Sequence, residues 1–79
     1  MAWEKFLKGS EEFIMFADFY KLCEQYWIPE GTDEYWQSYI DAVNEFEKKH
    51  VKIKLSRYIG SALSKYLEEK WRNQNANVG

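Results

Sequence analysis

The chain has one cysteine, one histidine and one proline, and its four glycines are far apart. Because Cys23 is alone, no disulfide can form within the chain, as is typical of proteins from a reducing compartment. One histidine and one cysteine supply too few of the ligands that transition metals prefer. The scattered glycines form no phosphate-binding loop. We therefore predict no metal site and no cofactor.

Long apolar runs are also missing. No stretch approaches the roughly 18 apolar residues of a membrane span, so we expect no membrane contact. The first residues, Met1 to Phe6, contain an acid and no long apolar run, and we expect no signal peptide. Together with the single thiol, these absences predict a cytoplasmic protein.

No catalytic constellation is recognisable either. The chain has no Gly-x-Ser-x-Gly motif, and its serines are explained as helix caps or surface residues. Glu47 and His50 have the Glu-x-x-His spacing of carboxylate di-iron bundles, but a second histidine for the second motif does not exist. His50 suits the negative end of a helix instead, and Cys23 is expected to be an inert core thiol. We predict a protein without catalytic or metal-binding residues, and hence not an enzyme.

Aromatic residues are abundant: four Trp, six Tyr and five Phe in 79 residues. Most recur at helical spacing. A chain this short buries a modest fraction of its unfolded surface. Rings that bury about 150–250 Å² each compensate for its small size.

The periodicity predicts an all-α fold, a small bundle of three principal helices. The first helix covers residues 11–26 after the N-cap Ser10, and Pro29 ends the segment that follows it. The second begins after the N-cap Thr32, and the third covers at least 56–72. The apolar residues of the first helix spread over more than half of its circumference, which indicates several neighbours or an external partner.

Three segments lie outside these helices. Trp3, Phe6 and Leu7 have helical spacing and predict an additional short N-terminal helical segment. Residues 50–55 alternate like a strand, but a bent connector with Val51 and Ile53 turned inward is the favoured interpretation. We expect one helical domain over 1–72 and a frayed polar tail over 73–79. Gly60 and Ser64 indicate either a close helix approach or a mild loss of helix propensity.

Three short helices cannot enclose fifteen large rings, so some rings should remain accessible. Trp and Tyr are enriched at binding hot spots. The partner would be another protein or a second copy of the chain, and scattered surface rings are the alternative interpretation. The candidate protein-interaction residues are Trp3, Phe6, Tyr26, Trp27, Tyr35, Trp36 and Trp71.

Charge is divided unevenly along the chain. Residues 1–47 hold three bases and eleven acids, whereas residues 48–79 hold eight bases and two acids. The basic part could neutralise successive phosphates of a nucleic acid, or it could pair with acids of the same chain. The candidate nucleic-acid-binding residues are Lys48, Lys49, Lys52, Lys54, Arg57, Lys65 and Arg72.

Two resemblances follow from these segments. The runs Asp33–Trp36, Phe46–Lys49 and Ala62–Lys70 resemble small helical proteins of phages and conjugative elements of Gram-positive bacteria. This resemblance implies an accessory role in a mobile element. Separately, Leu55–Leu67 is similar to the second helix of ribbon-helix-helix DNA-binding proteins, although the strand-like run 51–55 abuts it directly and the intervening helix of that family is missing.

The sequence thus predicts a non-enzymatic helical protein-interaction module, an accessory or regulatory protein of a phage or mobile element. A nucleic-acid-binding protein that uses the basic segment 48–57 and the outer face of the last helix is the alternative. The partner, the oligomeric state and the path of residues 50–55 stay open.

Overall fold

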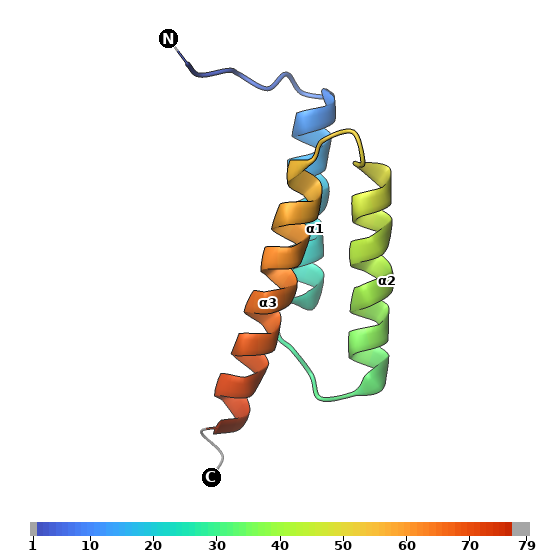
Figure 1. Cartoon of the computed structure of the whole chain (residues 1–79), viewed down its shortest axis with the longest axis vertical. Helices are drawn as coiled ribbons and strands as arrows, with labels where there is room; N and C mark the ends of the chain where they lie inside the picture. The colour runs from blue at the N-terminus through green and yellow to red at the C-terminus, as the bar shows by residue number, and fades with distance from the viewer. Residues whose placement is uncertain (1, 77–79) are drawn as a thin grey trace.

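Three helices alternate in direction along the chain: α1 (Glu11–Tyr26), α2 (Asp33–Lys49) and α3 (Leu55–Ala76). The computed structural model describes residues 2–76. α1 and α3 run in the same direction and α2 runs in the opposite one (Figure 1). Within residues 2–76 no strand is present, so the predicted all-α fold is confirmed.

Side-chain caps start the first two helices. Ser10 Oγ accepts a hydrogen bond from the N–H of Phe13 (3.3 Å), and Thr32 Oγ1 accepts one from the N–H of Tyr35 (3.1 Å). Each of these helices also has two acids in its first turn, where carboxylates are stabilised by the positive end of the helix dipole. The predicted N-caps are therefore confirmed.

Residues 2–10 are not helical, so the predicted N-terminal helical segment is wrong. A helix of one or two turns gains too few hydrogen bonds to offset the cost of nucleation, and Gly9 has a φ of 92°, outside the helical region. The segment is nevertheless in contact with the bundle, since the ring of Phe6 stacks on that of Phe16 with centroids 5.7 Å apart.

The link between α2 and α3 is a tight connector, as favoured from the sequence. The carbonyl of His50 accepts hydrogen bonds from the N–H of Ile53 (3.0 Å) and from Ser56 Oγ (3.0 Å). Ile53 packs against the core, as predicted, but Val51 is exposed. A connector this short can turn only one of the two side chains toward the bundle.

The third helix is longer than predicted, because it continues to Ala76 rather than ending at Arg72. The first four residues of the predicted polar tail are therefore helical. The rest of that tail, residues 77–79, lies outside the described residues.

The core combines aliphatic side chains with tyrosine rings whose hydroxyl groups are hydrogen bonded. Tyr35 donates to the carbonyl of Tyr26 (2.7 Å), and the hydroxyls of Tyr39 and Ser64 lie 2.7 Å apart. Burial, with smaller effects of neighbouring acidic groups, raises the pKa of Tyr35 to about 12. The nine buried hydrophobic residues are Met15, Leu22, Tyr26, Tyr35, Tyr39, Val43, Phe46, Leu63 and Leu67.

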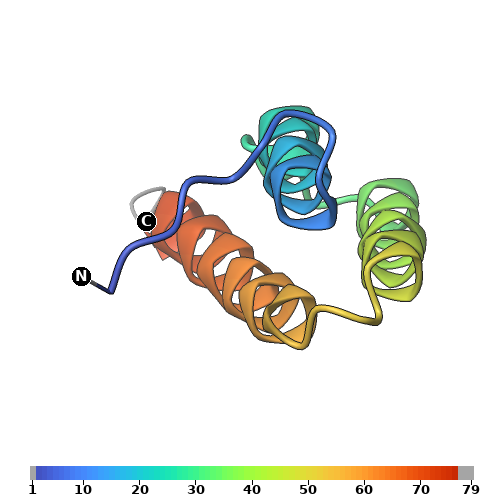
Figure 2. The ribbon, with the colours of Figure 1, turned by 90° about the horizontal axis from the view of Figure 1, so that it is seen from above.

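The helices are not equally close to one another. Each of α1 and α3 packs against α2, whereas α1 and α3 approach each other less closely, as the view along the bundle shows (Figure 2). Gly60 of α3 is buried, and a Cβ placed there would come within 3.3 Å of Val43 and 2.9 Å of Glu47 in α2. Gly60 therefore permits a close approach of two helices, which decides between the two interpretations of this glycine.

Candidate interaction surfaces

Three aromatic residues of α1 and the residue that caps its C-terminus form an exposed row on one side of the helix: Phe13, Phe16, Tyr20 and Trp27, here called the aromatic stripe. Their spacings of three, four and seven residues keep them on one helix face. At 100° per residue, this face is turned roughly 140° from the direction of the buried residues Met15 and Leu22. Tyr20 is the most exposed of the four, at 65%.

Helix α3 presents a second exposed row on the same side of the bundle: Leu55, Tyr58, Ala62 and Tyr66, here called the α3 row. The two rows meet where Trp27 contacts Tyr66, with ring centroids 5.6 Å apart. Lys70 clamps this junction, because its Nζ donates to the carbonyl of Trp27 and lies 4.1 Å from the centroid of the Trp27 ring. We call the side of the molecule that carries both rows the open face.

The residues proposed from the sequence for protein interaction fall into three groups. Trp3, Phe6 and Trp27 are exposed, as expected. Trp36 and Trp71 are half-buried: Trp36 packs edge-on against Tyr35 and Tyr39, and the ring of Trp71 lies against Gly31. The expectation is wrong for Tyr26 and Tyr35, which are buried in the core.

These candidates lie at two ends of α1 and do not form one surface by themselves. The residues that join them are Phe13, Phe16 and Tyr20, which belong to the wide apolar arc of the first helix but were not proposed as interaction residues. Tyr58 and Tyr66 were assigned to the core from their helical spacing, and both are exposed. The heptad-like spacing of the stripe shows in the sequence that its rings share one side of the helix, but it does not show that this side stays uncovered.

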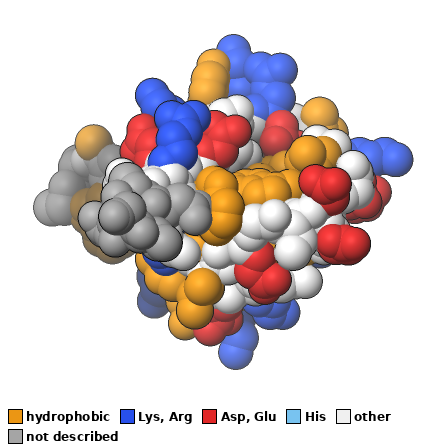
Figure 3. Space-filling view, turned by 90° about the horizontal axis from the view of Figure 1, so that it is seen from below, with side chains coloured by type: hydrophobic (Ala, Val, Ile, Leu, Met, Phe, Trp, Pro, Cys, Tyr) orange, Lys and Arg blue, Asp and Glu red, His pale blue; other side chains and the backbone are white. Residues whose placement is uncertain are grey.

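Hydrophobic side chains also reach the end of the molecule at which α1 finishes and α2 begins. There they gather at the centre of the surface and acidic side chains lie beside them (Figure 3). Trp27 and Ile28 are exposed in this region, and Glu30, Asp33 and Glu34 follow them in the chain. The stripe therefore runs from the N-terminal end of α1 to an acidic rim at its C-terminal end.

The seven basic residues proposed for nucleic-acid binding are all exposed. Arg57, Lys65 and Arg72 lie on the face of α3 that is turned away from the core, and Lys54 immediately precedes the helix on the same side. Two of the seven have acidic partners in the chain, since Lys49 pairs with Asp18 (2.9 Å) and Arg72 with Glu68 (3.7 Å). The structure thus brings four of these bases to one side of α3, and it also shows internal pairing.

A polar cluster around the buried ring of His50 joins α1 to the end of α2. The ring of His50 is only 6% exposed, and its Nε2–H donates to Asp18 Oδ2 at 2.7 Å, while Lys49 Nζ lies 2.9 Å from the same oxygen. Partial burial by itself would raise the pKa of Asp18. The hydrogen bonds from Lys49 and His50 and their charges outweigh that effect, so the pKa of Asp18 is lowered. The cluster fixes α1 to α2.

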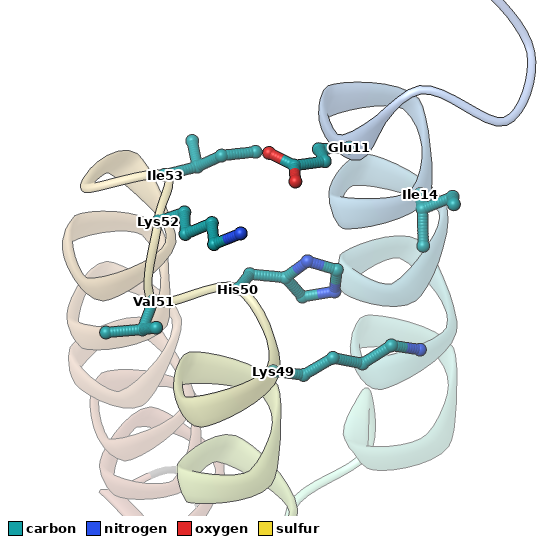
Figure 4. A pocket seen from close by; sticks show the side chains of 7 residues that line it. All are labelled: Glu11, Ile14, Lys49, His50, Val51, Lys52 and Ile53. Carbon is teal, nitrogen blue, oxygen red and sulfur yellow. The ribbon is translucent and has the colours of Figure 1, made fainter.

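A shallow cavity of about 260 Å³ lies beside this cluster, between the start of α1 and the connector to α3. Figure 4 shows the His50 ring extending toward α1, with Lys49 below it and Lys52 above it. Ile14, Val51 and Ile53 supply the apolar part of the lining. Because His50 Nε2 and Lys49 Nζ both contact Asp18, their role beside this cavity is to hold α1 against α2.

The single thiol is half-buried at the side of the core. Desolvation raises the pKa of Cys23, which lowers the fraction of reactive thiolate. Its position agrees with the interpretation as a structural thiol.

Within the described part of the chain, no cluster of three or more His, Cys, Asp or Glu side chains could hold a metal ion. Likewise, no helix between residues 2 and 76 is sufficiently long and apolar to cross a membrane.

No protein-family model, curated protein or solved structure matches this chain.

Proposed function

We propose that this chain is a non-enzymatic helical interaction module that binds another protein surface through its open face. The observation that supports this most is the alignment of the aromatic stripe along one face of α1. It offers four exposed rings in one row and continues through the contact of Trp27 with Tyr66 onto α3. Contiguous apolar patches of this kind mark interaction sites, whereas single exposed rings do not.

The balance between buried and exposed apolar residues supports the same function. Among the described residues, fourteen large hydrophobic side chains are exposed and nine hydrophobic residues form the buried core. Aromatic anchors contribute much of the binding energy at protein interfaces because they offer rigid apolar area. A chain with more large apolar groups outside than inside has a surface that a partner can cover.

The biological setting is part of the same proposal. The resemblance of Asp33–Trp36, Phe46–Lys49 and Ala62–Lys70 to small helical proteins of phages and conjugative elements supports an accessory or regulatory role in a mobile element. A half-buried single thiol suits the reducing cytoplasm. We place the interaction there.

A photo-crosslinker tests where the partner binds. A benzoylphenylalanine at position 20, in the centre of the stripe, should form a protein adduct on irradiation of cells that produce the full chain. The matched control carries the same group at position 40, because Ile40 is 47% exposed but lies on α2, away from the open face. Gel mobility and mass spectrometry of the adducts would identify what was captured.

Protein adducts at position 20 that are absent at position 40 are the expected result. Equal labelling at both positions would instead show that the stripe is an ordinary apolar surface. Adducts with nucleic acid, formed at position 57 on the basic side of α3, would favour the alternative function.

Nucleic-acid binding is the second candidate, supported by Lys54, Arg57, Lys65 and Arg72 on one side of α3. It receives less support because Glu68 pairs with Arg72 on that side and Asp18 pairs with Lys49. In addition, α1 has four acids and one base, and its negative charge would repel phosphates.

A further inference from the structure

The open face leaves apolar side chains uncovered. The chain itself has a surface that is complementary to this face in charge and in the position of its apolar residues. We propose that a second copy of this chain covers the open face, in a two-fold symmetric dimer in which α1 of each copy lies on α3 of the other. This inference rests on the proposed function, because it names the partner of the same surface.

The exposed area is the first argument. A compact protein of 9.6 kDa is expected to expose about 5,100 Å², whereas this chain exposes 6228 Å². The extended N-terminal segment contributes part of the roughly 1,100 Å² difference. A standard stable interface buries about 800 Å² on each partner. The excess surface is therefore of the same order as one protein interface, with the open face contributing only the share that lies outside the N-terminal segment.

Charge selects which helices face each other. Helix α1 carries four acids and one base, a net charge of −3, and α3 carries four bases and two acids, a net charge of +2. Two copies of α1 laid on each other would bring like charges together, which is unfavourable at close range. Placing α1 on the partner's α3 brings unlike charges together twice, because a two-fold axis repeats every contact.

The heights of the residues along the bundle fit this pairing. Trp27 and Tyr66 are at the same height, since their rings touch. With a rise of about 1.5 Å per residue, Tyr20 is then level with the segment between Tyr58 and Ala62, and Phe16 is level with Leu55. A two-fold axis parallel to the helices exchanges α1 with α3 and leaves heights unchanged. Phe16, Tyr20 and Trp27 of the stripe are therefore level with apolar residues of the partner's α3 row, whereas Phe13 is level with the connector that precedes α3.

One charged pair follows from the same geometry. Glu24 precedes Trp27 by one turn on the outer margin of the stripe, and Lys65 adjoins Tyr66 on the outer margin of the α3 row. Both side chains are exposed in the single chain. In the dimer, Glu24 of one copy and Lys65 of the other lie on the same margin and differ in height by about 3 Å, which these long side chains can span, so they are placed to pair.

Sedimentation equilibrium of the full chain, with exchange of the two charges, tests this arrangement. The wild-type chain should sediment with twice the mass of 9.6 kDa. Glu24→Lys and Lys65→Glu should each weaken the dimer about tenfold or more, since each places like charges on both margins. An equimolar mixture of the two variants should recover dimers, because in the mixed dimer one margin has the reversed pair and the other has the native pair.

Two controls separate fold from association. Circular dichroism of both variants should show unchanged helix content, since both positions are exposed. Ile40→Glu, on α2, should leave the dimer intact.

Three results would overturn the inference: a wild-type chain that stays monomeric at the highest soluble concentration, single variants that dimerise as well as the wild type, or a mixture that does not recover. None of these results would contradict the proposed function, because that function is tested separately, by crosslinking from position 20 to a different protein. Conversely, a dimer that is disrupted by Ile40→Glu but not by the charge reversals would show that α2, and not the open face, forms the interface.

Discussion

At the scale of single residues, Asp18 is the polar group on which the packing of α1 depends most. Its carboxylate accepts hydrogen bonds from both His50 and Lys49. Its pKa is lowered in the folded chain, since those two donors outweigh the effect of partial burial. A lowered pKa means that the ionised carboxylate stabilises the fold above the pKa of the unfolded chain, and that this stabilisation disappears as the pH falls through the folded value.

Asp18→Asn should therefore lower the free energy of unfolding at neutral pH by about 1–2 kcal/mol. The difference from the wild type should shrink as the pH falls below the ordinary Asp value of 3.8. Urea unfolding of both proteins at neutral and acidic pH measures this. Asp41→Asn is the matched control, because Asp41 accepts only an exposed hydrogen bond from Gln37. A difference that persists unchanged in acid would show that the carboxylate charge is not the cause.

Residue identity alone did not show which rings are covered. Tyr26 and Tyr35 were among the rings expected at the surface because three short helices cannot enclose fifteen large rings. They are buried because the Tyr35 hydroxyl reaches the carbonyl of Tyr26 and the Tyr26 hydroxyl lies 2.5 Å from that of Ser38. A tyrosine can enter a core when its hydroxyl finds a partner, and such partners are set by tertiary structure.

At the scale of helices, capping residues and apolar spacing were sufficient to predict where α1 lies and where α2 begins. The predicted bounds of α1 agree with the observed Glu11–Tyr26, and Thr32 caps α2 as expected. Both depend on neighbours within four residues in the chain. The N-terminal segment and the end of α3 were predicted less well. Apolar spacing does not show whether a single turn is stable as a helix, and a polar sequence does not show at which residue a helix ends.

Thr32→Ala should destabilise the fold by about 1 kcal/mol, since the N–H of Tyr35 would lose its capping oxygen. Thermal unfolding followed by circular dichroism measures the change. Thr32→Ser is the matched control, because it keeps the hydroxyl and should stay close to the wild type. Equal losses in both variants would assign the effect to the threonine methyl group.

At the scale of the whole molecule, the wide apolar arc of the first helix predicted either several neighbours or an outside partner. It could not predict which part of the arc would stay uncovered. That depends on how α3 is placed, and α3 packs on α2 through the small residue Gly60 rather than closing against α1. The exposed rings Phe16, Tyr20 and Tyr66 follow from this asymmetry, and helical spacing contains no information about it.

A dimer that stabilises the fold should make the melting temperature of the wild-type chain rise with protein concentration, because association removes folded monomer from the unfolding equilibrium. Calorimetry over a wide concentration range measures this. The Glu24→Lys chain should show a smaller rise. A wild-type melting temperature that does not change with concentration would show that association does not stabilise the fold.

The close packing of α2 with each of its neighbours in the chain has a kinetic consequence. All well-packed helix pairs are consecutive in sequence, so the loops that must close during folding are short. Chains with such low contact order typically fold within microseconds to milliseconds. Folding should therefore be complete long before two newly made copies meet by diffusion.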